Sequence, residues 1–346
     1  MRHGEERAGL LFAALCAVNG AFVPAVAKLT TDRADPLFVA AATTACAGAT
    51  ALVVLAARRQ LALLVHRRIG PRLFAVGALG TGAAYWFFFQ GARRTGAIET
   101  ALCLQIEPAY SLLAAWLFLG QRPDGRRLAA IVLVLSGIAL ALAAGPSTAL
   151  AGASGGAGVW LLLATPLSWQ LSHLIVLRGL GGVPPTVLTG ARYVYGGIVL
   201  AALWTLAGAT TDVGGVAEWR ALSIALVLQG VVLAYAGTMM WYEAIARLDL
   251  ARTTAIVVPS IPLLSLLATF ALVGERPTPP QVVGMALTAI GVLGFVTAPH
   301  AITTGTRVPI WTAPLTTPRR RAGGGLRRRR RPGGDLRRRT RPGGQP

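Results

Sequence analysis

The sequence predicts an all-α integral membrane protein with ten transmembrane helices in two inverted five-helix repeats. The first observation is composition. Apolar residues make up 54% of the 346 residues and charged residues only 13%, with 41 glycines, and the mean hydropathy is +0.59. A soluble domain has more charge and less apolar surface than this. The other two observations are a series of long apolar segments and an internal repeat.

The apolar segments are helices that cross the membrane. A span needs about 20 mainly apolar residues, and continuous apolar runs favour helices because lipid cannot satisfy exposed backbone groups. The sequence predicts ten such spans, at 8–27, 36–57, 73–92, 97–118, 128–144, 157–177, 185–207, 221–242, 253–273 and 279–298.

The internal repeat relates residues 92–137 to residues 246–291. Laid together without a gap, at an offset of 154, the two segments share 15 identities in 46 positions, where composition alone gives roughly four or five. Five predicted crossings separate equivalent points, so the second copy enters the membrane upside down. Inverted repeats of this kind are typical of secondary transporters.

Basic residues indicate the orientation. With the N-terminus inside, the cytoplasmic loops and N-terminus carry 13 Lys and Arg before residue 300 and the external loops carry six. This bias places both termini in the cytoplasm of a multi-pass protein of the cell inner (plasma) membrane. A cleaved signal peptide is the alternative for the first span, but its loss would unbalance the repeat.

At its most distinctive segments the sequence resembles a known family. Residues 104–108 read LQIEP, residues 112–123 are an apolar run ending in Gly-Gln-Arg-Pro, and residues 272–277 end in Gly-Glu-Arg-Pro. These segments resemble the drug/metabolite transporter superfamily in its ten-span EamA-like form, over about residues 8–298. Gln121 replaces the usual Glu of the first turn, and Ile261 stands where the second copy would carry its Glu.

The resemblance implies a secondary active transporter, a proton-coupled exporter of a small organic metabolite, amino acid or drug. An importer of the same substrates is one alternative, and a membrane anchor acting through its basic tail is another. The sequence contains no phosphate-binding loop, so the energy would come from an ion gradient. Four scattered histidines and three cysteines within spans offer no metal site, cofactor or enzyme active site.

Glu107 is the main candidate for proton coupling or substrate binding. It lies near the middle of span four, where insertion of a carboxylate costs about 3 kcal/mol, so we expect it to face a cavity. Pro108 and, in span nine, Pro259 and Pro262 are predicted helix breaks near the membrane centre. The alternatives are a structural Glu that bonds to a neighbouring helix, and prolines that only kink the helix.

Other polar or aromatic side chains within spans complete the candidate site. Trp169 and His173 are four residues apart and share one helix face. Arg192 is interpreted as reaching to the cytoplasmic headgroups, with an anionic substrate as the alternative. Helix packing is an alternative for several of the rest. The candidates for substrate or proton coupling, with Glu107, are Gln105, Asn19, Trp169, His173, Gln90, Tyr235 and Ser260.

The expected organisation has three parts. A first EamA-like repeat covers residues 1–150, a second covers 151–300, and residues 301–346 form a disordered cytoplasmic tail rich in Arg, Gly and Pro. The tail holds 13 Arg against one Asp. A neutral repeat expansion is the favoured interpretation of this composition. Anionic lipid headgroups are the expected partner if the tail binds one, and nucleic acid is disfavoured.

Overall fold

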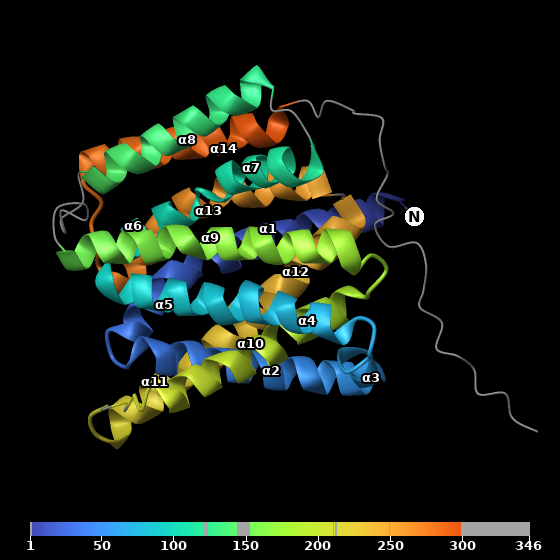
Figure 1. Ribbon diagram of the computed structural model, residues 1–346. Coiled ribbons are helices and arrows are strands. Elements are labelled where there is room, and N and C mark those ends of the chain that lie inside the picture. The colour runs from blue at the N-terminus through green and yellow to red at the C-terminus, as the bar shows by residue number, and fades with distance from the viewer. Residues whose placement is uncertain are drawn as a thin grey trace, which may run out of the picture.

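The computed structural model describes residues 2–120, 124–143, 153–209, 211, 213–248 and 250–298. The predicted tail and Gln121 lie outside these residues. The described elements are helices, with no strand among them (Figure 1). They are α1 (Arg2–Thr31), α2 (Pro36–Ala57), α3 (Leu61–Leu64), α4 (Gly70–Gly77), η1 (Ala78–Ala83), α5 (Ala84–Arg94), α6 (Ala97–Leu104), α7 (Glu107–Leu119), α8 (Gly125–Ala143), α9 (Ala153–Gly179), α10 (Pro185–Leu206), α11 (Val216–Leu228), η2 (Gln229–Ala236), α12 (Gly237–Leu248), α13 (Leu250–Val273) and α14 (Pro279–Thr297).

The ten predicted spans are confirmed. Ten segments of the described chain are long and apolar enough to cross a membrane, and each overlaps one prediction. They are Gly4–Thr31, Pro36–Ala57, Gly70–Arg94, Ala97–Phe118, Gly125–Ala143, Gly156–Gly179, Pro185–Leu206, Val216–Ile245, Ile256–Val273 and Pro279–Thr297. The protein is therefore a multi-pass membrane protein.

The helices pair in a way that follows the repeat. Span one (α1) packs against α12 and α13, while its equivalent, span six (α9), packs against α5, α6 and α7. The remaining spans pair with their own equivalents, α2 with α10 and α8 with α14. Figure 1 shows α8 beside α14 at one edge of the bundle and α2 beside α10 towards the other. The two halves of the chain are thus interleaved around α1 and α9.

Equivalent helices also end in the same way. Gly120 closes α7 and Gly274 follows α13, with φ angles of 66° and 75°. This left-handed conformation is strained for other residues, so glycine is the usual residue that ends a helix there. The two glycines are identical residues of the sequence repeat, which explains one of its matches.

Spans three and eight each contain a widened π-helical turn, η1 and η2. The two spans are equivalent in the repeat, and the offset of 154 places η1 on residues 232–237, which overlap η2. A π-helical turn costs regular hydrogen bonding and is found most often at functional sites. The π-helical turns therefore lie at equivalent positions within spans three and eight.

One predicted break is correct in position and another is wrong. Span four is interrupted at Gln105 and Ile106, between α6 and α7, directly before the Glu107–Pro108 pair. Span nine, in contrast, runs as the continuous helix α13 through Pro259 and Pro262. Membrane helices tolerate proline where side chains re-satisfy the freed groups. The hydroxyl of Ser260, which lies between the two prolines, donates to the Ile256 carbonyl of the same helix at 2.7 Å.

Candidate functional site

Glu107 is held at the break of span four. It is the first residue of α7, and Pro108 follows at a position where the missing N–H costs nothing. The start of a helix carries a partial positive charge that favours a carboxylate. The side chain is half-buried, and Nε2 of Gln170 in α9 donates to its Oε1 at 3.2 Å. The carboxylate is therefore bound across the two repeats.

Trp169 and His173 lie on the inner face of α9. At about 100° per residue they point about 120–160° away from Leu167 and Leu171, two exposed leucines on the outer face of the helix. His173 is nevertheless exposed and Trp169 half-buried. Two turns before Trp169 on the same face, Leu162 is fully buried. Exposure on this face of α9 thus increases from Leu162 towards the end of the helix that carries Arg178.

The opposite end of span four is buried and capped. The start of α6 is covered by two carboxylates, because Glu99 accepts from the Gly96 amide at 2.9 Å and Glu275 accepts from the amides of Ala97 and Ile98 at 3.0 and 3.2 Å. These amides would otherwise lack partners at a helix N-terminus. The Gly-Glu-Arg turn of the second repeat therefore fixes the first half of span four.

Side chains from other spans bind the carbonyls of the two π-helical regions. Asn19 Nδ2 donates to the Val232 carbonyl in η2 at 2.9 Å, and Tyr193 donates to Ala234 in η2 at 2.9 Å. On the other side, Ser172 donates to the Val76 carbonyl just before η1 at 3.2 Å. Asn19 is thus engaged in helix packing, which is the structural alternative that the sequence left open.

Arg192 corrects its interpretation from the sequence. Its Nη2 donates to the Gly80 carbonyl within η1 at 3.0 Å, so the guanidinium points into the bundle and not to the headgroups. Its Nε is buried and has no hydrogen-bond partner among the described residues. A Cβ at Gly80 would lie 3.5 Å from that Nε and 2.5 Å from the Ser172 hydroxyl. The glycine makes room for the Ser172 side chain, whereas the distance to Arg192 is an ordinary contact.

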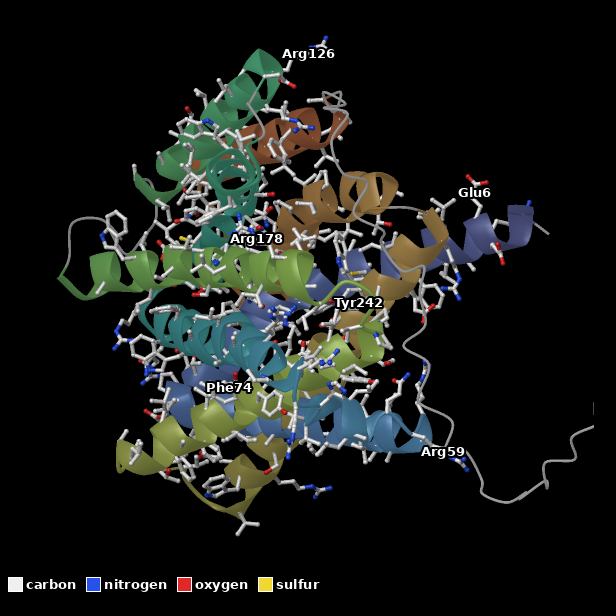
Figure 2. All side chains as sticks on the ribbon, turned by 45° about the vertical axis from the view of Figure 1, so that its right-hand side comes forward. Glu6, Arg59, Phe74, Arg126, Arg178 and Tyr242 are labelled. Atoms are coloured by element: carbon white, nitrogen blue, oxygen red, sulfur yellow. The ribbon has the colours of Figure 1, made fainter. Side chains whose placement is uncertain are left out.

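Helix α9 brings Arg192 close to the candidate residues. Its Ser172 lies with Arg192 against Gly80, and its Gln170 bonds to Glu107. At about 100° per residue, Trp169 and His173 point between Ser172 and Gln170. Figure 2 shows Tyr242 among the helices, whereas Arg59 lies at the edge of the molecule. Glu107, Gln170, Trp169, His173 and Arg192 therefore form one group, contributed by α7, α9 and α10.

Four other candidates lie apart from this group or serve their own helices. Gln90 accepts from Arg94 at 2.6 Å near the exposed end of α5, and Gln105 caps α6 with a weak bond of 3.5 Å to the Ala101 carbonyl. Ser260 bonds within α13, as described above. Tyr235 is buried in η2 against Ala47, Ala51 and Tyr193.

Two apolar hollows on the bundle contain none of the candidates. One lies between α8 and α14, around Ala130 and Gly291. The other lies between α2, α3 and α10, around Leu61 and Tyr195. Within the described part of the chain, no group of three His, Cys, Asp or Glu side chains could hold a metal ion.

Several contributing residues could not be singled out from the sequence. Gln170 is one polar residue among several in the spans, and only the structure turns it towards Glu107. Glu275 was recognised as part of a turn motif but without a role. Glu99 could not be singled out because it lies two residues into span four, where a carboxylate is expected to reach the water. Its position three residues after Gly96 is the pattern of a helix cap.

The fold and this site define a membrane transporter built from two five-helix repeats. Comparison with known proteins names the family: the sequence profile of the EamA-like transporter family matches residues 7–143 and 156–297. The chain belongs to this family, which is part of the drug/metabolite transporter superfamily. Its members are transporters, so the chain is a transporter and not an enzyme.

Individual relatives are more distant. The chain is 28% identical over 259 residues to an uncharacterised protein of Pseudomonas aeruginosa, covering 72% of this chain and 84% of that protein. It is 28% identical over 229 residues to a probable terminal-alkyne amino-acid exporter of Streptantibioticus cattleyicolor, covering 64% and 72%. A protein of known crystal structure matches the fold with a TM-score of 0.61 at 19% identity, over 85% of this chain and 96% of that one.

Proposed function

We propose that this transporter is a proton-coupled exporter of a small organic metabolite, and that amino acids are its substrate class. Glu107 is the proposed coupling residue. The observation that carries the proposal is the half-buried carboxylate at the break of span four. An ionisable group inside a membrane span is costly and is kept where it serves a substrate or ion pathway.

The surroundings of Glu107 suit a carboxylate that gains and loses a proton. The start of α7 and the amide of Gln170 support its charged form. The mainly apolar bundle supports its neutral form, since burial disfavours charge. A carboxyl group whose charged and neutral forms are both stabilised can bind and release a proton as the site opens to each side of the membrane in turn.

The choice of amino acids is supported by a relative. The protein of Streptantibioticus cattleyicolor is named as a probable exporter of an amino acid, and the match covers most of both chains. Metabolites or drugs of other classes are the alternative substrates for the same scaffold, and import is the alternative direction of transport.

We further propose that both termini lie in the cytoplasm of the cell inner membrane, as the Lys and Arg bias predicts. In that orientation the capped start of α6 faces outward and the open end of α9 faces inward. The structure would then be an inward-open state, ready to bind a cytoplasmic substrate. Its two repeats, within residues 1–150 and 151–300, would be the parts that move relative to one another.

Transport by reconstituted protein tests the coupling. Liposomes containing wild-type protein are loaded with each amino acid, and release is measured with and without an imposed pH gradient. We expect release driven by the gradient in the wild type and no such dependence in Glu107→Gln. Glu243→Gln is the matched control, because its carboxylate pairs with Arg247 on an exposed surface of α12. Gradient-driven release in Glu107→Gln would remove Glu107 from the mechanism.

The tail separates the carrier from the membrane-anchor alternative. A variant that ends at residue 300 should retain transport, because the ten spans and the group around Glu107 are intact. An anchor that works through its tail would lose its activity in the same variant. Binding of the tail to vesicles with anionic lipid, compared with neutral vesicles, tests the proposed lipid partner.

A further inference from the structure

Arg192 is a cation inside the bundle without an opposing charge in contact. Among the described residues its guanidinium makes no ion pair. The bond from Nη2 to the Gly80 carbonyl uses one of its five N–H donors. Nε is buried without a partner. A buried charge that is left unpaired costs free energy, so residues of this kind inside spans mark substrate or ion pathways.

The position of Arg192 is built into the fold. It comes from α10, yet its guanidinium is fixed on a π-helical turn of span three. Gly80 of that turn is also in contact with the hydroxyl of Ser172 from α9, so three spans meet at this point. A bond between the guanidinium and a backbone carbonyl fixes its direction without neutralising its charge.

Glu107 supplies the opposite charge at a distance from Arg192. The two side chains do not form a salt bridge, and α9 lies beside both. Its Ser172 contacts Gly80, as Arg192 does, and its Gln170 engages Oε1 of the Glu107 carboxylate. At about 100° per residue, His173 points between Ser172 and Gln170 and is exposed, so there is open space on this side of the bundle. The carboxylate and the guanidinium thus flank this space without touching.

We propose that Arg192 binds the carboxylate of the transported substrate, while Glu107 holds its ammonium group. The inference rests on the proposed function and adds the residue that selects for a carboxylate. A guanidinium binds a carboxylate with two parallel N–H bonds, and this fork is not reproduced by lysine. A zwitterion would neutralise both half-buried charges at once, which neither an amine nor a carboxylic acid alone can do.

Ligand-induced thermal stabilisation of the purified protein in detergent tests this assignment. The probes are the twenty standard L-amino acids, followed by the carboxamide and the decarboxylated amine of each one that stabilises the wild type. We expect at least one amino acid to bind, and its amide and amine to bind about tenfold or more weakly, as expected for the loss of a charged hydrogen-bonding partner.

Substitutions then assign this preference to Arg192. In Arg192→Gln the preference for the amino acid over its amine should disappear, and in Arg192→Lys it should fall but persist. Arg178→Gln is the matched control, because Arg178 is exposed at the end of α9 and donates to the Phe118 carbonyl. It should keep the wild-type preference. The unfolding temperature without ligand shows whether each variant is folded, and Arg192→Lys keeps the charge if Arg192→Gln does not fold.

Two results would overturn the assignment: stabilisation of the wild type by no amino acid, or an unchanged preference in the folded Arg192 variants. The outcome is separable from the coupling proposal. Loss of preference in Arg192→Gln without any effect of a pH gradient on wild-type transport would retain Arg192 and reject proton coupling. Gradient-driven transport with an unchanged preference would do the reverse.

Discussion

The Nε2 of Gln170 donates a hydrogen bond of 3.2 Å to Oε1 of Glu107. The two residues are 63 positions apart and come from different repeats, since Glu107 begins α7 and Gln170 lies in the middle of α9. Any movement of one repeat against the other must keep, stretch or break this bond. It therefore links the charge on Glu107 to the relative position of α7 and α9.

The first prediction concerns Gln170→Leu. At alkaline pH, where Glu107 is ionised, this variant leaves a half-buried carboxylate without its amide donor, and we expect a loss of about 1–3 kcal/mol of stability. At acid pH the carboxyl is protonated, needs no donor for a charge, and the loss should be smaller. Thermal unfolding in detergent at both pH values measures the difference.

The control is the double variant with Glu107→Gln. An amide at position 107 does not titrate, so Gln170→Leu should then have the same effect at both pH values. If the single variant already shows no pH dependence, Glu107 does not change its charge in this range.

The second prediction concerns the contact of α8 with α14. A Cβ at Gly137 would lie 2.5 Å from the Gly284 carbonyl oxygen, and a Cβ at Gly284 would lie 2.5 Å from the Gly137 carbonyl oxygen. Small residues let membrane helices approach this closely. Gly137→Val or Gly284→Val should therefore push the helices apart, lowering the unfolding temperature and the amount of folded protein in the membrane.

Gly125→Val in the first turn of α8 is the comparison, because nothing lies within 4 Å of a Cβ there. It should have little effect on stability or slightly raise it, because valine has a higher helix propensity than glycine. Equal losses at positions 125 and 137 would mean that valine acts through the helix itself and not through the contact.

The sequence predicts much of this fold because the membrane imposes simple rules. Ten apolar runs of the right length give ten spans, and the offset of 154 gives the inverted repeat. Glu107 could be singled out because a carboxylate in such a run is rare. Its place at a helix break was indicated by Pro108, which cannot donate to the preceding turn.

Other features depend on how each helix is rotated about its axis, and the hydropathy of the sequence does not determine this rotation. Arg192 is close enough to the cytoplasmic end of span seven to reach the headgroups, yet its hydrogen bond is to Gly80 in a neighbouring span. Pro259 and Pro262 look like a stronger break than Pro108, but α13 stays continuous. The π-helical turns have no residue pattern that distinguishes them from α-helix.

The third prediction concerns Glu275. Its carboxylate accepts from the amides of Ala97 and Ile98 and so caps α6 from the other repeat. Glu275→Ala should cost about 0.5–2 kcal/mol, the usual effect of losing a helix cap. Glu275→Gln should cost less, because one oxygen remains to accept while the favourable charge is lost.

Thermal unfolding in detergent measures both variants, with Glu243→Gln as the control for losing a carboxylate elsewhere. Glu243 forms an ion pair with the neighbouring Arg247 on an exposed helix face, where such pairs contribute little. If Glu275→Ala is no less stable than this control, the cap does not hold the outer half of span four.

The last prediction concerns which end of the bundle is open. Single cysteines are placed in α9 in a background where Cys16, Cys46 and Cys103 are alanine, and labelled with a membrane-impermeant maleimide. His173→Cys should react from the cytoplasmic side, in inside-out vesicles, because this position is exposed on the inner face of the helix. It should react little from the outside, since the start of α6 is capped and buried.

Two further positions separate an aqueous cavity from mere exposure. Leu162→Cys shares the inner face but is fully buried in the outer half, so it should stay unlabelled from either side. Leu171→Cys is 38% exposed on the opposite face, where lipid and not water covers it, and should also stay unlabelled. Labelling of position 171 as fast as 173 would show that exposure does not distinguish cavity from lipid here. Labelling of position 173 from the outside alone would reverse the proposed inward-open state.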